Sequence, residues 1–442
     1  MLINPGDDLP TPMASTAGTL STEVKGDVVE DADEEVVRQI PGHSSNDAVT
    51  FLDVLKLMVP NLVGDAAGST DLKKNKNGLN EGGMMVFFSL SEREFASKKK
   101  KISAMHLAVY KERPAYFSIL KELIRHAKDL NCRDDDDWTP LHWAAQFGNV
   151  EAMELLLQHK AEIDPRAVDG RTPLMQAAIG NHADAVRLLL AKGADVKATT
   201  ETGKTGLMAA VIGGDAETTQ ALIDGGSDVN HVADFDVTAL HCATTKGLDD
   251  ITALLLAAGA DPNFKDWELS TPLHRCCSTA VDEADEAGRK ARRDIAEALI
   301  TAGADVEAKD HERRTALQYA GQNGSTELVE VLLTRGADIN SLDADGRTPL
   351  YNAVGAGPIA TIRLLISSGA RVDVIGRKNM NALFPACVRG NKEVVEMLLE
   401  GGIEVNLKDE TDGPETPLMV AIRNQHLELV SMLLERGADP CM

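Results

Sequence analysis

The tetrapeptide Thr139-Pro140-Leu141-His142 begins a pattern that returns along most of the 442-residue chain. Similar tetrapeptides begin at positions 172, 205, 238, 271, 315, 348, 381 and 416, so neighbouring copies lie 33 residues apart except for one gap of 44 and one of 35. A degenerate copy, Ser103-Ala104-Met105-His106, lies 36 residues upstream of the first. A fixed period of this length indicates a repeat architecture, in which each copy packs on its neighbours. The sequence therefore predicts about ten structural units, one of which carries an 11-residue insertion.

Each unit is predicted to contain two helices and a hairpin loop. The first Thr can accept a hydrogen bond from the N–H groups at a helix start. The Pro that follows has no backbone N–H, but an N–H at this position would have no partner within the helix. Nine residues after the Thr most copies carry Gly, as at Gly148, and we expect this residue to adopt the left-handed conformation that ends a first helix. An apolar triplet such as Leu155-Leu156-Leu157 then forms the buried stripe of a second helix, and a turn such as Gly193-Ala194-Asp195 ends one.

The Thr-Pro-Leu-His start, the Gly, the Leu triplet and the Gly-Ala-Asp turn together resemble the ankyrin repeat, over roughly residues 103 to 442. The resemblance implies an all-α fold with β-hairpin fingers. In this ankyrin-repeat α-solenoid, paired antiparallel helices stack and the fingers line a concave face. We expect the domain to span residues 98–442. Because neighbouring repeats bury each other's apolar faces, no single central core is needed.

The sixth unit carries the insertion, at residues 281–291. Asp285 and Arg289 are an oppositely charged pair four residues apart, which favours a helix. Either the first helix of the unit extends into the insertion, or both helices lengthen and turn at Gly288. The insertion is either a solvated extension or a protrusion that contacts a partner. In the ninth unit, Pro385 is expected to loosen the first helix.

Residues 1–97 contain no repeat. They carry 7 basic and 16 acidic residues, and we expect an acidic, mostly disordered region. Within it, residues 47–59 are amphipathic. We expect them to form a short helix that docks on the first repeat, and we favour this interpretation over an export signal. The basic run Lys98–Lys101 is interpreted as a solvated helix start rather than a nuclear import signal.

Charge and composition argue against several classes of function. Lys and Arg number 45 and Asp and Glu 69, so the net charge of −24 disfavours binding to nucleic acid or anionic lipid. No run approaches about 18 consecutive apolar residues, and the N-terminus does not read as a signal peptide, so we expect neither membrane insertion nor secretion. Six cysteines, two of them adjacent, form no disulfide framework, which favours a reducing compartment. The expected localisation is cytoplasmic, with the nucleus as the alternative.

No catalytic motif is present: the sequence lacks a phosphate-binding loop, a nucleophile elbow, a zinc-protease motif and the kinase signatures. The adjacent Cys276 and Cys277 are expected to behave as small buried hydrophobes. Four histidines share one motif position, and the resemblance implies that they hydrogen-bond to the neighbouring hairpin rather than bind metal: His106, His142, His241 and His274. We therefore predict no enzyme activity, no cofactor and no metal site.

A partner-binding surface remains, which the resemblance places on the finger tips and on exposed positions of the first helices. These positions are acidic and aromatic in the early repeats, as at Asp134 and Asp266, and more basic in the later ones. Trp143, Gln176 and Arg275 are expected to be exposed on first helices. Ordinary variation in surface loops is the alternative interpretation. The predicted contact residues are Trp138, Trp143, Phe235, Trp267, Tyr319, Arg313, Arg314, Arg347, Arg377 and Lys378.

The predicted function is a non-catalytic scaffold or adaptor that binds a protein partner through this groove. The alternatives are a regulatory or accessory subunit of an enzyme complex and a nuclear transcription cofactor. The chain is expected to be mainly monomeric, with weak self-association through the last repeat, whose first helix contains Met419 and Ile422. Four asparagines have a context that resembles asparaginyl hydroxylation sites, although a role in starting the hairpin is favoured: Asn230, Asn263, Asn340 and Asn406.

Overall fold

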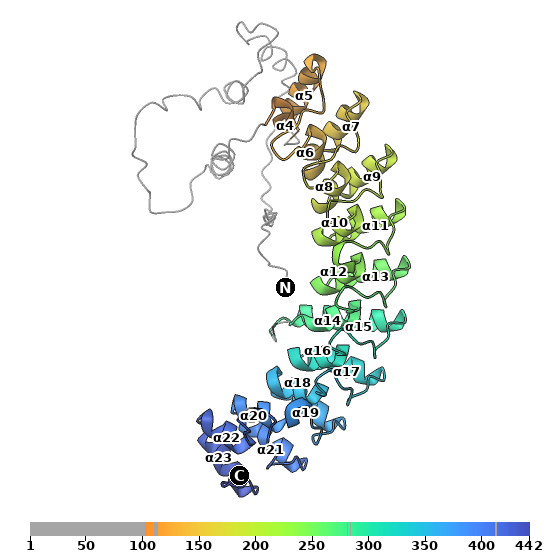
Figure 1. Ribbon diagram of the computed structural model, residues 1–442. Helices are drawn as coiled ribbons and strands as arrows, with labels where there is room; N and C mark the ends of the chain where they lie inside the picture. The colour runs from red at the N-terminus through yellow and green to blue at the C-terminus, as the bar shows by residue number, and fades with distance from the viewer. Residues whose placement is uncertain (1–101, 110–113, 281, 283, 412) are drawn as a thin grey trace, which may run out of the picture. The chain divides into compact units, whose positions relative to one another are not determined.

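The computed structural model describes residues 102–109, 114–280, 282, 284–411 and 413–442. The predictions for the acidic region 1–97, the helix at 47–59 and the run Lys98–Lys101 lie outside these residues. Within the described ranges, twenty α-helices form ten consecutive pairs (Figure 1). The first helices are α4 (Ala104–Ala108), α6 (Pro140–Gln146), α8 (Pro173–Ile179), α10 (Gly206–Gly213), α12 (Ala239–Lys246), α14 (Pro272–Ser278), α16 (Ala316–Asn323), α18 (Pro349–Ala356), α20 (Leu383–Arg389) and α22 (Pro417–Arg423). The second helices are α5 (Pro114–His126), α7 (Val150–Gln158), α9 (Ala183–Ala191), α11 (Ala216–Asp224), α13 (Asp249–Ala257), α15 (Glu286–Thr301), α17 (Thr326–Thr334), α19 (Ile359–Ser367), α21 (Lys392–Glu400) and α23 (Leu427–Glu435).

The pairs stack in chain order. Each first helix packs on the first helix of the next pair, and second helices pack on each other from α5 to α19 and between α21 and α23. Two rows of helices result, which Figure 1 shows side by side. The helical solenoid predicted from the repeat is confirmed.

Apolar side chains are buried at every step of the stack. The middle leucine of the triplet is fully buried in repeat after repeat, as at Leu156, Leu189 and Leu255. Truncating one such leucine to alanine typically costs about 2–5 kcal/mol. Small residues such as Ala145 and Ala178 are equally buried and let neighbouring first helices approach closely.

The helix ends follow the predicted chemistry. Thr205 Oγ1 accepts a hydrogen bond from Met208 N at 3.3 Å, and Thr348 Oγ1 accepts one from Tyr351 N at 3.2 Å. Gly214 follows α10 with φ of 83°, a left-handed conformation that a side chain would strain. The Thr and Gly positions thus begin and end the first helix in these repeats, whereas Gly357 after α18 adopts an extended conformation with φ of −77°.

The loop before each first helix is a hairpin finger. A typical finger is closed by a backbone hydrogen bond across its base, such as Asp266 N to Ser270 O at 3.0 Å. Neighbouring fingers are joined by a further backbone bond, such as Trp267 N to Phe235 O at 3.1 Å. In the described part of the chain the only isolated β-bridge joins Thr199 and Thr205, so the fingers carry almost no strand.

The insertion lengthens only the second helix of its repeat. α14 ends at Ser278, whereas α15 begins at Glu286 and runs for 16 residues in place of the usual nine. Asp285 caps α15 by accepting a hydrogen bond from Gly288 N at 2.9 Å, so Gly288 lies inside the first turn. Both predicted alternatives are therefore wrong, because the first helix does not overshoot and the chain does not turn at Gly288.

The prediction that Pro385 loosens its helix is also wrong. α20 begins at Leu383, one residue later than the motif suggests, and Ala382 is its N-cap. Pro385 is therefore the third helical residue, where the backbone N–H has no partner within the helix. A proline in the first turn removes no hydrogen bond.

None of the helices in the described ranges combines the length and the apolar character that crossing a membrane requires.

Candidate functional site

The fingers are built around an aspartate at their base. In the finger 134–138, Asp134 Oδ1 accepts hydrogen bonds from the backbone N–H groups of Asp136 at 3.0 Å and Trp138 at 2.9 Å. Asp266 and Asp310 do the same in the fingers 266–270 and 310–314. These aspartates are buried, so the expectation that Asp134 and Asp266 present charge at the tips is wrong.

The second carboxylate oxygen of each aspartate binds a side chain on the following first helix, nine residues later. Asp134 Oδ2 accepts from Trp143 Nε1 at 2.9 Å, and Asp266 Oδ2 from Arg275 Nε at 2.8 Å. Asp310 Oδ2 accepts from Tyr319 Oη at 2.8 Å. This pairing was not predicted from the sequence, although it has a readable signal: an Asp five residues before the motif Thr and a hydrogen-bond donor four residues after it.

This pairing corrects two of the predicted contact residues. Trp143 is only 6% exposed, since its ring lies against Trp138 and Phe147 and its N–H is used by Asp134, so its predicted exposure is wrong. Tyr319 is half-buried, and burial together with its hydrogen bond to Asp310 raises the pKa of its hydroxyl. Each side chain binds the aspartate at the base of its finger from the first helix that follows.

Phe235 and Trp267 are the two most exposed aromatic side chains of the described residues. Phe235 is 64% exposed and Trp267 51% exposed, and their ring centroids lie 5.9 Å apart on adjacent fingers. Phe235 adopts φ of 63° at the centre of its finger, a conformation that is uncommon for a bulky residue. Trp138 is half-buried and stacks on His142 at 6.3 Å.

Acidic side chains surround this aromatic pair. Asp234 and Asp236 flank Phe235 and are both exposed. Glu268 follows Trp267, and its carboxylate already binds Arg275 at 2.9 Å. The net result is an exposed apolar surface with two unburied carboxylates beside it.

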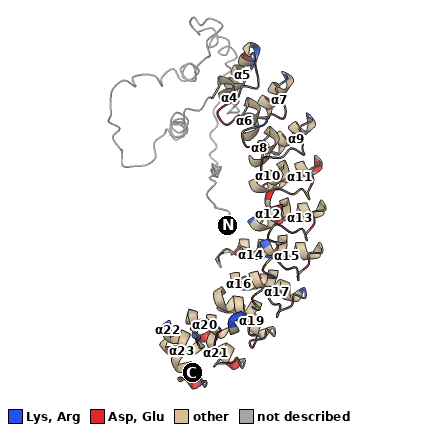
Figure 2. Ribbon diagram, in the orientation of Figure 1, with Lys and Arg blue, Asp and Glu red and all other residues tan. Residues whose placement is uncertain are grey.

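Most of the predicted basic residues are paired with acids. Arg314 binds Asp310 at 3.0 Å and Glu312 at 3.0 Å, while Arg347 and Arg377 both approach Asp345, at 3.2 and 3.3 Å. Arg313 and Lys378 are exposed finger-tip residues. Figure 2 shows basic and acidic residues interspersed along the loops and helix ends. Any basic character of the later fingers therefore rests mainly on Arg313 and Lys378.

The four motif histidines connect neighbouring repeats. In His142, Nδ1 accepts from Thr139 N at 3.1 Å, so the proton lies on Nε2, which donates to Arg171 O at 3.1 Å in the next finger. The corresponding Nε2 bonds run from His106 to Trp138 O, from His241 to Ser270 O and from His274 to Arg314 O. Burial lowers the pKa of all four, and that of His142 to about 4. The neutral ring is thus a structural hydrogen-bonding group.

The four asparagines also connect repeats. Asn230 Oδ1 accepts from Asp261 N at 2.8 Å, and its Nδ2 donates to Gly259 O at 3.0 Å. Asn263 and Asn406 make both corresponding bonds, and Asn340 accepts from Arg371 N. These amides have a structural role at the turn after the second helix.

The described residues contain no group of three or more His, Cys, Asp or Glu side chains arranged to hold a metal ion. Cys276 and Cys277 are fully buried in α14. Burial also raises the pKa of the Cys387 thiol, to about 12, which disfavours the thiolate form that metals bind.

Comparison with known proteins gives the family. The family described as ankyrin repeats (3 copies) matches residues 105–200, 192–266, 285–376 and 374–442. Protein phosphatase 1 regulatory subunit 12A of Mus musculus and that of Rattus norvegicus are each 44% identical to this chain over 54 residues, which is 12% of this chain and 5% of each relative's length. The crystal structure of the human ASB11 ankyrin repeat domain is similar with a TM-score of 0.46 and 24% identity, over 52% of this chain and 98% of that one. Because the family match covers more than half of its length, the chain belongs to the ankyrin-repeat family.

Proposed function

We propose that this chain is a non-catalytic scaffold or adaptor that binds a protein partner through its fingers. Ankyrin repeats are protein–protein interaction modules, and the observation that carries the proposal here is the exposed pair Phe235 and Trp267. Phe235 leaves 64% and Trp267 51% of its surface in water, so the packing of the repeats buries neither ring fully. Exposed aromatic anchors beside polar groups are typical of binding hot spots.

The surroundings of the pair favour a partner segment that is both apolar and basic. An apolar side chain can cover the two rings, and a Lys or Arg beside it can meet the carboxylates of Asp234 and Asp236. Complementary charge of this kind raises association rates and excludes acidic competitors. Trp138, Arg313 and Lys378 are proposed as further contacts on their own fingers.

The test is quantitative affinity purification of partners with the full chain and with the double variant Phe235→Ala/Trp267→Ala. We expect the double variant to recover at least about tenfold less partner than the unaltered chain, because truncating hot-spot aromatic side chains usually weakens binding by that much. The matched control is Val168→Ala, which removes an exposed apolar side chain from the finger 167–171, where no contact is proposed. Equal recovery with the double variant and the control would overturn the proposal.

A regulatory or accessory subunit of an enzyme complex is the second candidate, because the two rodent relatives are named as regulatory subunits of a phosphatase. The similarity covers only 54 residues of repeat sequence, so it supports the class of function and no particular enzyme. Assaying the purified complexes for catalytic activity, with and without residues 1–97, separates this candidate from a passive scaffold.

We further propose a cytoplasmic location, which imaging of the tagged chain would distinguish from the nuclear location that a transcription cofactor requires. The chain is proposed to be mainly monomeric, with weak self-association through its last repeat. The exposure of Met419 and Ile422 supports this proposal.

A further inference from the structure

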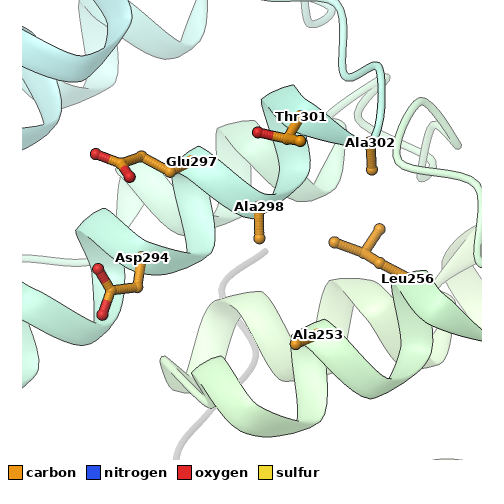
Figure 3. A pocket seen from close by; sticks show the side chains of 7 residues that line it. All are labelled: Ala253, Leu256, Asp294, Glu297, Ala298, Thr301 and Ala302. Atoms are coloured by element: carbon orange, nitrogen blue, oxygen red, sulfur yellow. The ribbon is translucent and has the colours of Figure 1, made fainter.

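A hollow lies on the surface between the packed second helices α13 and α15 (Figure 3). It has a volume of about 500 Å³, and its lining includes Ala253 and Leu256 of α13 and Ala298 and Ala302 of α15. In Figure 3 the side chains of Leu256 and Ala298 point into the gap between the two helices.

Two departures from the repeat pattern produce the hollow. At the position of Ala253 other repeats carry long polar side chains, such as Glu154, Arg187, Gln220 and Arg363. At the position of Ala298 most repeats carry a larger apolar residue, such as Leu155 or Leu188. Ala253 and Ala298 face each other across α13 and α15 and leave unfilled the space that those side chains would occupy.

The hollow is apolar at its floor and acidic at one end. Asp294 and Glu297, one turn apart on α15, line it and lie together at the same end in Figure 3. Glu297 binds the exposed Arg293 at 3.1 Å, whereas no ion pair of Asp294 is found within the described part of the chain. A ligand here must cover the apolar floor, and it must pair with any carboxylate that it removes from water.

We propose that this hollow takes a lysine or arginine side chain from a protein partner, at a second surface separate from the fingers. The methylene stem lies on Ala253, Leu256 and Ala298, and the charged group reaches Asp294 and Glu297. Basic side chains bury their stems on apolar surface in this manner while the charged end stays at the rim. A purely aromatic or aliphatic side chain fits less well, because it would desolvate the two carboxylates.

The test uses a displayed library of random peptides and the full chain. The library is first depleted on the variant Ala253→Arg, which fills the hollow and adds a positive charge to it, and is then selected on the unaltered chain. Ala253→Arg is expected to fold normally, since Arg187 and Arg363 occupy the same position in other repeats. Its thermal unfolding midpoint should stay within about 2 °C of the unaltered chain.

We expect the recovered peptides to share a Lys or Arg beside an apolar residue. Their affinity should fall at least about tenfold on Ala253→Arg and on the isosteric double variant Asp294→Asn/Glu297→Gln. Gln220→Arg, which adds the same charge one repeat earlier, should change the affinity less than about twofold. Phe235→Ala/Trp267→Ala should also leave it unchanged, which separates this surface from the proposed finger site. The proposal is overturned if no peptide survives depletion, if survivors carry no basic residue, or if they bind all variants equally.

Discussion

Gln176 on α8 is fully buried, and neither its amide nitrogen nor its amide oxygen has a hydrogen-bond partner in the structure's described ranges. It occupies the first-helix position where Trp143, Arg275 and Tyr319 bind the aspartate of their finger. In this repeat the finger position five residues before the Thr is Ala167, so the acceptor is missing. A buried polar group without a partner costs about 1–3 kcal/mol.

Replacing Gln176 with Met is therefore expected to stabilise the protein by about 1 kcal/mol, because an apolar side chain of similar volume loses no hydrogen bond. The measurement is the thermal or denaturant unfolding midpoint of the full chain. Gln318→Met is the matched control, since Gln318 is equally buried but accepts from Thr315 N and donates to Arg347 O, each at 2.9 Å. The control should lose about 1–3 kcal/mol. A loss of stability in both variants would contradict this account of Gln176.

His142 is expected to make the fold sensitive to acid. Its native pKa of about 4 lies below the ordinary value of 6.5, so the unfolded chain takes up the proton first as the pH falls. The stabilisation is complete above about pH 6.5 and is lost progressively as the pH falls toward 4, by up to about 2 kcal/mol at pH 5.

The variant His142→Gln should reduce this loss. Gln318 stands at the same motif position in its own repeat and makes the same two hydrogen bonds without a titratable group. Unfolding of the unaltered chain and of the variant is compared between pH 7.5 and pH 5. We expect the two curves to converge as the pH falls, and parallel curves would show that His142 does not contribute to the acid response.

At the scale of the helices, the sequence predicted most of the fold because each helix is bounded by local chemistry. Thr, Pro and Gly act on their own turns, so the period of 33 residues placed the helices correctly. The finger aspartates, the burial of Trp143 and the extension of α15 were not predicted. None of them follows from the chemistry of helix ends. The pairing of Asp134 with Trp143 joins two separate elements, and its nine-residue spacing can be recognised only once that contact is known.

Arg292 shows how a helix is fixed by such contacts. It is buried, and its guanidinium donates to Thr244 O at 2.8 Å, Thr245 O at 2.7 Å and Cys276 O at 3.1 Å. These carbonyls lie near the C-terminal ends of α12 and α14, where backbone acceptors lack helical partners and a positive charge is favoured. The side chain thereby joins three helices at the repeat that carries the insertion.

Arg292→Met is expected to destabilise the fold by about 3 kcal/mol, because it leaves these carbonyls without donors. Hydrogen exchange in α12, α14 and α15 should increase together with the loss in unfolding midpoint. Arg293→Met is the matched control, as the neighbouring arginine is exposed and binds only Glu297 among the described residues. The control should change stability by less than about 0.5 kcal/mol. Equal effects of the two substitutions would contradict the role given to Arg292.

At the scale of the whole chain, stability comes from repeated contacts between neighbours, which cover each internal repeat on both sides. In the last repeat the position of Ile422 corresponds to Ala178, Val354 and Cys387 in earlier copies, which are almost fully buried by the repeat that follows. Ile422 itself is 56% exposed, and Met419 on the same helix and Leu434 on α23 are exposed as well. This surface has the composition of an interface between repeats.

The 442-residue chain is accordingly expected to self-associate weakly through this surface. Sedimentation at concentrations of about 100 µM and above should show the average mass rising with concentration, as a small apolar interface allows. Ile422→Glu should weaken the association at least about tenfold, because a carboxylate would be desolvated at the centre of the contact. Ile375→Glu places the same charge on an exposed isoleucine of an earlier finger and should have no effect. A strictly monomeric profile of the unaltered chain, or equal association of both variants, would show that this surface does not bind a second copy.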